Sequence, residues 1–287
     1  MKTLLVPVAL HEALPSVFET ALRVAQRFGS LIEGVSLRPA LAEYVPVDMV
    51  GGMTWLRDEE ADRAEAAAAG ERFIAFMEAA GLPRRDAVGT CAPEAALCAG
   101  PRYRWRPDMP PGDAFLGQYA RLFAATVVGR PGSEESAPRM TTVETALFES
   151  GRPILLAPPQ PPSSLGEAIL VAWNGSTETA RAIAFAMPFL RRARRILVLS
   201  TEGGMVPGPS AEDVARSLAC EGIEAFHKAM PAGRRTPGEV YLDEAGTFGC
   251  DLLIKGAYTQ SRLRQMIFGG PTSHILSHAT IPVLMAH

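Results

Sequence analysis

Short, continuous apolar runs alternate along the chain with longer segments in which apolar residues recur every three or four positions. Apolar runs of this kind are typical of strands buried on both faces of a parallel sheet, and the periodic segments predict amphipathic helices. In the first half we expect strands at 3–9, 31–36, 86–91, 125–128 and 154–157, and helices at 14–28, 58–80, 114–123 and 142–149.

The second half repeats this order of elements. We expect strands at 169–173, 196–200, 223–228, 252–255 and 282–286, and helices at 177–190, 211–221, 237–248 and 272–279. Three apolar segments match between the halves in the same order: 4–9 with 169–174, 126–129 with 252–256, and 153–157 with 282–286. Such self-similarity indicates a duplication. Alternating strands and helices predict two doubly wound, parallel-sheet, Rossmann-like α/β domains in tandem.

Proline-rich segments mark the boundaries of these units. We place the first domain at 1–158, a stiff linker at 159–166 and the second domain at 167–287. The first domain is longer, and its extra residues are assigned to 37–57 and 100–112, where prolines stop regular structure. The segment 37–57 is interpreted as a surface loop or as a flap over the edge of the sheet.

The second insertion contains Arg102-Tyr103-Arg104-Trp105-Arg106, in which cations alternate with aromatic residues. Cations beside aromatics can bind single-stranded nucleic acid by stacking. Five residues are too few to build such a surface. The segment is therefore interpreted as a loop decorated with cation–π contacts.

Composition narrows the class of protein. The 287 residues are 47% hydrophobic and 21% charged, a balance that excludes long disordered segments. The formal net charge is −3, so we expect no nucleic-acid partner. No apolar run reaches the length of a membrane span, so no membrane partner is expected. The four cysteines form no CxxC pair, which argues against a disulfide framework or structural zinc and fits the reducing cytoplasm.

One constellation could carry chemistry. Gly256 ends a predicted strand, and Gly269-Gly270-Pro271-Thr272 opens a predicted helix. Glycines permit positive φ and let backbone amides approach a phosphate, while the free amides and dipole of a helix N-terminus favour an anion. The same residues are also compatible with ordinary turn chemistry.

Together with the two repeats, these residues make the whole chain resemble a tandem universal stress protein. The nucleotide signature of that family is Gly, two residues, Gly, nine residues, Gly, then Ser or Thr. Its four positions are held here by Gly256, Thr259, Gly269 and Gly270. The spacing matches, whereas the second and fourth residue types differ. The family also has an acidic residue after its first strand, which contacts adenine or ribose, and Asn174 holds that position.

The first half departs further from the signature. Ala9 holds the position of Asn174, and Thr142 and Val143 follow Gly129 and Gly132 where a glycine is expected. The resemblance therefore implies a degenerate first site and a partly retained second one. It also implies an adenine nucleotide alpha hydrolase-like fold whose repeats pair through their last strands as an internal pseudo-dimer. A homodimer and an unidentified protein partner stay open.

Two functions follow as hypotheses. The first is a cytoplasmic stress-response protein that binds an adenine nucleotide, ATP, in its second repeat at Asn174, Gly256, Thr259, Gly269, Gly270, Pro271 and Thr272. The second is a nucleotide-free scaffold in which both sites have decayed. No catalytic residue is assigned, and at most slow ATP hydrolysis is expected.

The sequence gives little support for a metal site or a catalytic nucleophile. No metal is expected beyond magnesium accompanying the nucleotide. His274 and His278 have a spacing that can bind zinc, but the following Glu of zinc proteases is absent. Ser176 is interpreted as a helix N-cap and not as a nucleophile.

Overall fold

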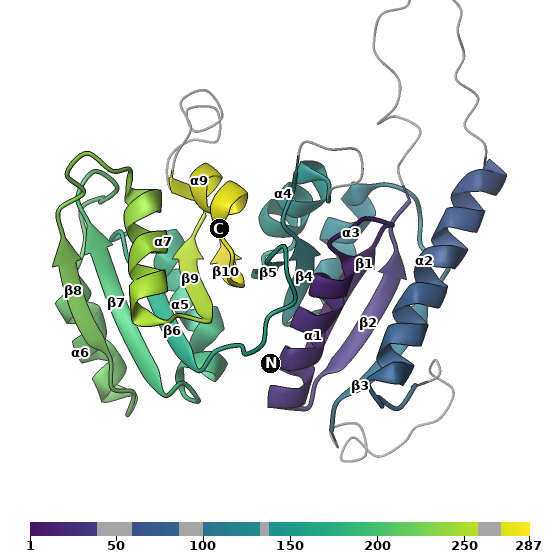
Figure 1. Cartoon of the computed structure of the whole chain (residues 1–287), viewed down its shortest axis with the longest axis horizontal. Helices are drawn as coiled ribbons and strands as arrows, with labels where there is room; N and C mark the ends of the chain where they lie inside the picture. The colour runs from purple at the N-terminus through teal and green to yellow at the C-terminus, as the bar shows by residue number, and fades with distance from the viewer. Residues whose placement is uncertain (39–58, 86–99, 133–137, 258–270) are drawn as a thin grey trace, which may run out of the picture.

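The computed structural model describes residues 1–38, 59–85, 100–132, 138–257 and 271–287 (Figure 1). In the first half the elements are β1 (Thr3–Val8), α1 (Leu14–Phe28), β2 (Leu31–Ser36), α2 (Glu59–Ala79), β3 (Arg102–Arg106), α3 (Asp113–Ala120), β4 (Ala125–Gly129), α4 (Met140–Glu149) and β5 (Ile154–Ala157). In the second half they are β6 (Ala168–Ala172), α5 (Thr177–Leu190), β7 (Arg195–Thr201), α6 (Ala211–Cys220), β8 (Phe226–Met230), α7 (Pro237–Phe248), β9 (Leu252–Gly256), α9 (Pro271–His278) and β10 (Val283–Ala286).

All described strands join one sheet in the order β3-β2-β1-β4-β5-β10-β9-β6-β7-β8. Neighbouring strands are parallel within each half, which confirms the predicted doubly wound α/β fold. β5 and β10 lie side by side in the middle of the molecule and pair antiparallel, with Leu155 opposite Leu284 (Figure 1). This is the pairing that the resemblance implies. Because the two halves run in opposite directions, the carboxyl ends of their strands lie at opposite edges of the sheet.

The hydrophobic cores of the two halves are continuous across this junction. On one face of the sheet, α1, α2, α5 and α6 share a cluster of buried residues, and the rings of Phe28 and Phe189 meet across the junction at 4.8 Å. On the other face, α4, α7 and α9 share a second cluster, and α3 covers a third around Leu5. The inner strands β1, β4, β6 and β9 are buried on both faces, as their continuous apolar sequences predict.

Local signals in the sequence set the ends of several helices. Ser176 caps α5 by accepting a hydrogen bond from the Thr179 amide, which confirms the predicted N-cap. Thr236 and Glu239 form a capping box at the start of α7, with Pro237 in its first turn. α1 ends at Gly29, whose φ of 64° a residue with a Cβ rarely adopts.

The interpretation of 100–112 as a loop is wrong, because Arg102–Arg106 is β3, the edge strand beside β2. The alternation of cations and aromatics in this segment is the period of a strand. Tyr103 is fully buried, and Trp105 packs against Phe73 of α2 with ring centroids 5.5 Å apart. On the opposite face Arg104 binds the buried carboxylate of Glu33.

The predicted cation–π contact does occur at the end of β3, where Arg106 lies 5.0 Å from the centroid of the Tyr119 ring. The strand expected at 86–91 lies outside the described residues, as does nearly all of the insertion at 37–57. Within the described part of the chain, no helix combines the length and the apolar character needed to cross a membrane.

Candidate functional site

In the second half, the residues at the carboxyl ends of β6 and β9 meet at the N-terminus of α5. The side-chain oxygen of Asn174 accepts hydrogen bonds from Thr179 Oγ1 at 2.7 Å and from the Ser176 amide at 3.2 Å. The Gly256 amide donates to the same Thr179 hydroxyl at 3.3 Å. One threonine hydroxyl therefore connects Asn174 with Gly256, two predicted site residues that are distant in sequence.

Gly256 is needed for space. It is not among the glycines with positive φ, so close approach and not an unusual backbone angle accounts for a glycine here. A Cβ at this position would lie 2.4 Å from the Thr179 amide nitrogen and 2.7 Å from Thr179 Oγ1. Among the described residues, the backbone that approaches Gly256 so closely is the first turn of α5.

Beneath the N-terminus of α9 lies a buried lysine. Lys255 is 5% exposed, and its ammonium donates to Thr272 Oγ1 at 2.8 Å and to the Gly256 carbonyl at 2.7 Å. Burial lowers the pKa of Lys255 to about 7, because the charged form loses its hydration. Among the described residues it forms no ion pair.

Sequence reasoning missed Lys255, although a signal was present. The strand Leu252–Gly256 is apolar apart from this one cation, and a cation inside a strand buried on both faces needs a partner. Its partner Thr272 was predicted as a site residue and is buried in the first turn of α9. Pro271 is the first residue of that helix. Thr259, Gly269 and Gly270 lie outside the described residues.

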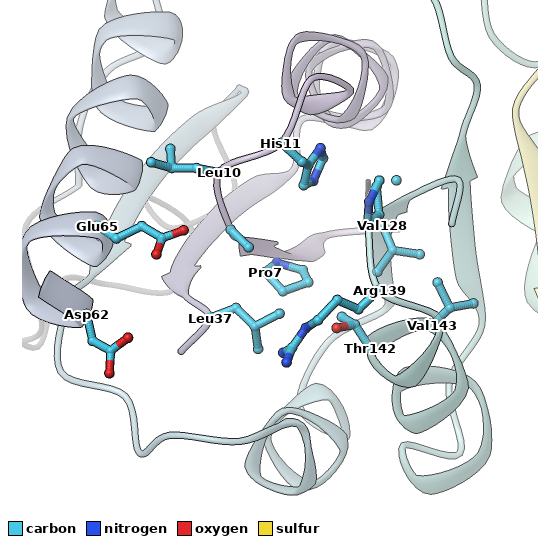
Figure 2. A pocket seen from close by; sticks show the side chains of 13 residues that line it. Pro7, Leu10, His11, Leu37, Asp62, Glu65, Val128, Arg139, Thr142 and Val143 are labelled. Atoms are coloured by element: carbon cyan, nitrogen blue, oxygen red, sulfur yellow. The ribbon is translucent and has the colours of Figure 1, made fainter. Parts of the chain in front are cut away.

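In the first half, a cavity of about 180 Å³ lies between the carboxyl ends of β1 and β4 and the helices α2 and α4 (Figure 2). We call it the first-half cavity. It is lined by Ala9, Gly129 and Thr142, three of the residues from which the resemblance implies a degenerate site. It therefore lies at the position in the first repeat that corresponds to the candidate site in the second.

The walls of this cavity differ from those of a glycine-lined phosphate site. A Cβ at Gly129 would lie 2.5 Å from Pro138 Cγ, so the proline ring fills the space beside the glycine. The Thr142 hydroxyl donates to Asp113 Oδ1 at 2.9 Å inside the protein. Burial lowers the pKa of His11 to about 4, so its imidazole in the cavity wall is neutral near pH 7.

The spacing of His274 and His278 brings their rings together but assembles no metal centre in the described part of the chain. The two rings stack with centroids 4.2 Å apart, and His278 Nδ1 lies 2.9 Å from the His274 carbonyl oxygen. Within the described ranges, no three His, Cys, Asp or Glu side chains are grouped so that they could hold a metal ion.

Comparison with known proteins finds a family match in the C-terminal part of the chain. Residues 232–287 match the model of the Universal stress protein family. This segment contains α7, β9, α9 and β10, and thus Lys255, Gly256 and Thr272. No curated protein matches the chain.

Solved structures extend the likeness in fold to the whole chain. A universal stress protein from Archaeoglobus fulgidus DSM 4304 has a TM-score of 0.68 at 16% identity, over 99% of this chain and 97% of that chain. A putative universal stress protein from Pseudomonas aeruginosa UCBPP-PA14 has a TM-score of 0.54 at 13% identity, over 100% and 93%. A functionally unknown protein from Pseudomonas aeruginosa PAO1 has a TM-score of 0.52 at 12% identity, over 100% and 92%. These likenesses, together with the family match, confirm the predicted resemblance.

Proposed function

We propose that this chain, a tandem universal stress protein, is a cytoplasmic stress-response protein that binds an adenine nucleotide, ATP, in its second half. The phosphates would lie at the carboxyl end of β9 and the N-terminus of α9. The observation that carries the proposal is the pair formed there by Lys255 and Thr272.

A buried ammonium without an anionic partner is costly, and an arriving phosphate would lower that cost. Among the described residues, Lys255 holds its charge against a hydroxyl and a carbonyl oxygen, directly beside the first turn of α9. That turn supplies free amides and the positive end of the helix dipole. A cation, a hydroxyl and a helix N-terminus together form a setting that favours a phosphate group.

The proposal also predicts proton uptake on binding. The Lys255 pKa is lowered to about 7 by burial, and a nearby phosphate raises a lysine pKa because it stabilises the charged form. Near pH 8 the ligand-free protein would hold a mostly neutral Lys255 and the complex a charged one. ATP affinity should then fall as the pH rises above 7.

Two experiments test the proposal in sequence. Denaturing the purified protein and analysing the supernatant by mass spectrometry would identify a released nucleotide. Calorimetric titration with ATP would then compare wild type with Lys255→Met and Thr272→Val. Loss of a charge-assisted hydrogen bond of about 1.5–3 kcal/mol should weaken binding about tenfold or more in Lys255→Met.

The matched control is Lys228→Met, because Lys228 is an exposed lysine on the edge strand β8 that pairs with Glu244. This variant should keep the wild-type affinity. Equal affinity of Lys255→Met and wild type would remove Lys255 from the site. If the denatured protein releases no nucleotide and ATP gives no heat of binding, the proposal itself is overturned.

One observation favours a nucleotide-free scaffold as the second candidate function. By resemblance Asn174 would contact adenine or ribose, yet its side-chain oxygen is engaged with Thr179 and Ser176. Gly256, too, is occupied by the approach of α5. Absence of nucleotide binding in both experiments would support this alternative, in which the fold serves contacts with a protein partner.

A further inference from the structure

The first-half cavity carries charges of both signs on its wall. Asp62 and Glu65 lie one turn apart on α2, and their carboxylates face the cavity from one side (Figure 2). Arg139, at the N-cap of α4, reaches toward Leu37 from the other side (Figure 2). The guanidinium also forms an ion pair of 3.2 Å with Asp113, which fixes the direction from which it enters.

The surface between these charges is mostly apolar. Pro7, Leu10, Leu37, Val128 and Val143 line the cavity between α2 and α4 (Figure 2). His11 adds one neutral polar group, and among the described residues its Nδ1 atom is buried without a hydrogen-bond partner. A ligand atom that bonds to this nitrogen would satisfy it.

Size limits what the first-half cavity can hold. Its volume of about 180 Å³ is smaller than the roughly 300–1,000 Å³ of pockets that hold drug-sized ligands. Pro138 fills the space beside Gly129 where a phosphate would approach the backbone. The carboxylates of Asp62 and Glu65 would in addition repel a polyphosphate. The cavity is therefore poorly suited to ATP.

We propose that the first-half cavity binds a small amphoteric molecule whose ammonium and carboxylate groups are separated by a short apolar chain. The ammonium lies toward Asp62 and Glu65, and the carboxylate toward Arg139, beside the ion pair that Arg139 forms with Asp113. The apolar chain rests on Leu37 and its neighbours. The inference concerns the first half only and does not depend on nucleotide binding in the second.

The test uses three probes that share one carbon chain. 5-Aminopentanoate carries both charges, pentylamine only the cation and pentanoate only the anion. Binding is followed by amide chemical shifts of the isotopically labelled full-length protein, read at Ala9, Leu10 and Gly129. 5-Aminopentanoate should bind more tightly than either single-charge probe. Equal affinity of pentylamine or pentanoate, or no shift with any probe, would overturn the proposal.

Variants assign each charge to its partner. In Asp62→Asn/Glu65→Gln, affinity for 5-aminopentanoate should fall about two- to fivefold per carboxylate, the range of exposed ion pairs, while pentanoate binding stays unchanged or improves. In Arg139→Gln, binding of 5-aminopentanoate and pentanoate should weaken, and binding of pentylamine should not. A loss that is the same for all three probes would indicate general disruption of the cavity and would contradict the assignment.

Two further variants test whether the probes bind inside the cavity or elsewhere on the surface. Glu71→Gln changes an exposed carboxylate of the same helix that does not line the cavity and should leave all affinities unchanged. Ala9→Leu fills the cavity from the end of β1 and should abolish the shifts, with the folded state checked by circular dichroism. Competition of ATP with 5-aminopentanoate for the same amides would overturn the assignment to an amphoteric ligand.

Discussion

Lys255 is the charged residue within a strand that is otherwise apolar or glycine. Its burial determines the pKa of its ammonium group. The ammonium is enclosed between β9 and α9, and within the described part of the chain its partners are one hydroxyl and one carbonyl oxygen. Burial favours the neutral form and lowers its pKa from 10.5 to about 7. The unfolded chain holds the proton more tightly than the folded protein does.

This difference fixes how Lys255 affects stability at each pH. Below about pH 7 the lysine is charged in both states, so the full cost of burying the charge is present. Between pH 7 and 10.5 the unfolded chain binds the extra proton, so the free energy of unfolding rises with pH. Lys255→Met should therefore be more stable than wild type by a few kcal/mol at pH 6, with a smaller gain at pH 10.

Urea unfolding of both proteins at pH 6, 8 and 10 measures this gain. Lys228→Met, which removes an exposed lysine, should show no comparable change with pH. A gain for Lys255→Met that is constant across the three pH values would show that its ammonium is hydrated in the folded state.

Among the elements, β3 and its contact with α2 were not anticipated from the sequence, which predicted a loop at 100–112. Trp105 of β3 lies against Gly70 in the middle of α2, and a Cβ at Gly70 would be 2.7 Å from the indole ring. Glycine weakens a helix by conformational entropy, but here it lets the strand with Trp105 approach the helix closely. The position of β3 thus depends on a residue that is unfavourable for α2 alone.

Replacing this glycine should reverse the usual effect of adding a methyl group in a helix. Gly70→Ala should lower the free energy of unfolding by about 1–3 kcal/mol, because the indole must move to accept the methyl. Gly246→Ala in α7 is the matched control, since nothing lies within 4 Å of its added Cβ. It should raise the free energy of unfolding by about 0.5–1 kcal/mol. Stabilisation by both substitutions in denaturant titrations would contradict the close packing of Trp105.

In the whole molecule, the two halves are joined by more than the β5–β10 pairing. Arg130, which directly follows β4 of the first half, donates to the carbonyl oxygens of Ser277 and Ala279 at the end of α9, at 2.8 and 3.3 Å. A cation at a helix C-terminus stabilises it through the helix dipole. The edge of the first-half cavity is thereby connected to the helix whose N-terminus contacts Lys255.

Removing this contact should loosen α9 selectively. Arg130→Ala should increase amide hydrogen exchange in α9 and cost about 1 kcal/mol of stability, with little change in α7. The matched control is Arg195→Ala, because Arg195 donates to the Phe248 carbonyl at the end of α7 within the second half. This second variant should loosen α7 and leave α9 unchanged. Equal exchange of α9 in wild type and Arg130→Ala would show that the first half does not support this helix.

The features that the sequence alone determined are those encoded locally or by repetition. Continuous apolar runs identified most strands, because a strand covered on both faces must be apolar throughout. Side-chain and proline signals placed the starts of α5 and α7, and the matched segments revealed the duplication. The sequence also placed Gly256 at the end of a predicted strand, and the resemblance assigned Asn174 to the position after the first strand of the second half.

Other features were decided only by the tertiary structure, because they depend on partners that are distant in sequence. Arg102–Arg106 becomes a strand because β2 offers Glu33 to Arg104 and α2 covers Tyr103 and Trp105. The prolines on either side of this strand led to the prediction of a loop. Proline restricts the local backbone, but it says nothing about whether the residues between two prolines pair with another strand. The lowered pKa of Lys255 and the mixed charges of the first-half cavity likewise arise from packing between separate helices and strands, which no local pattern encodes.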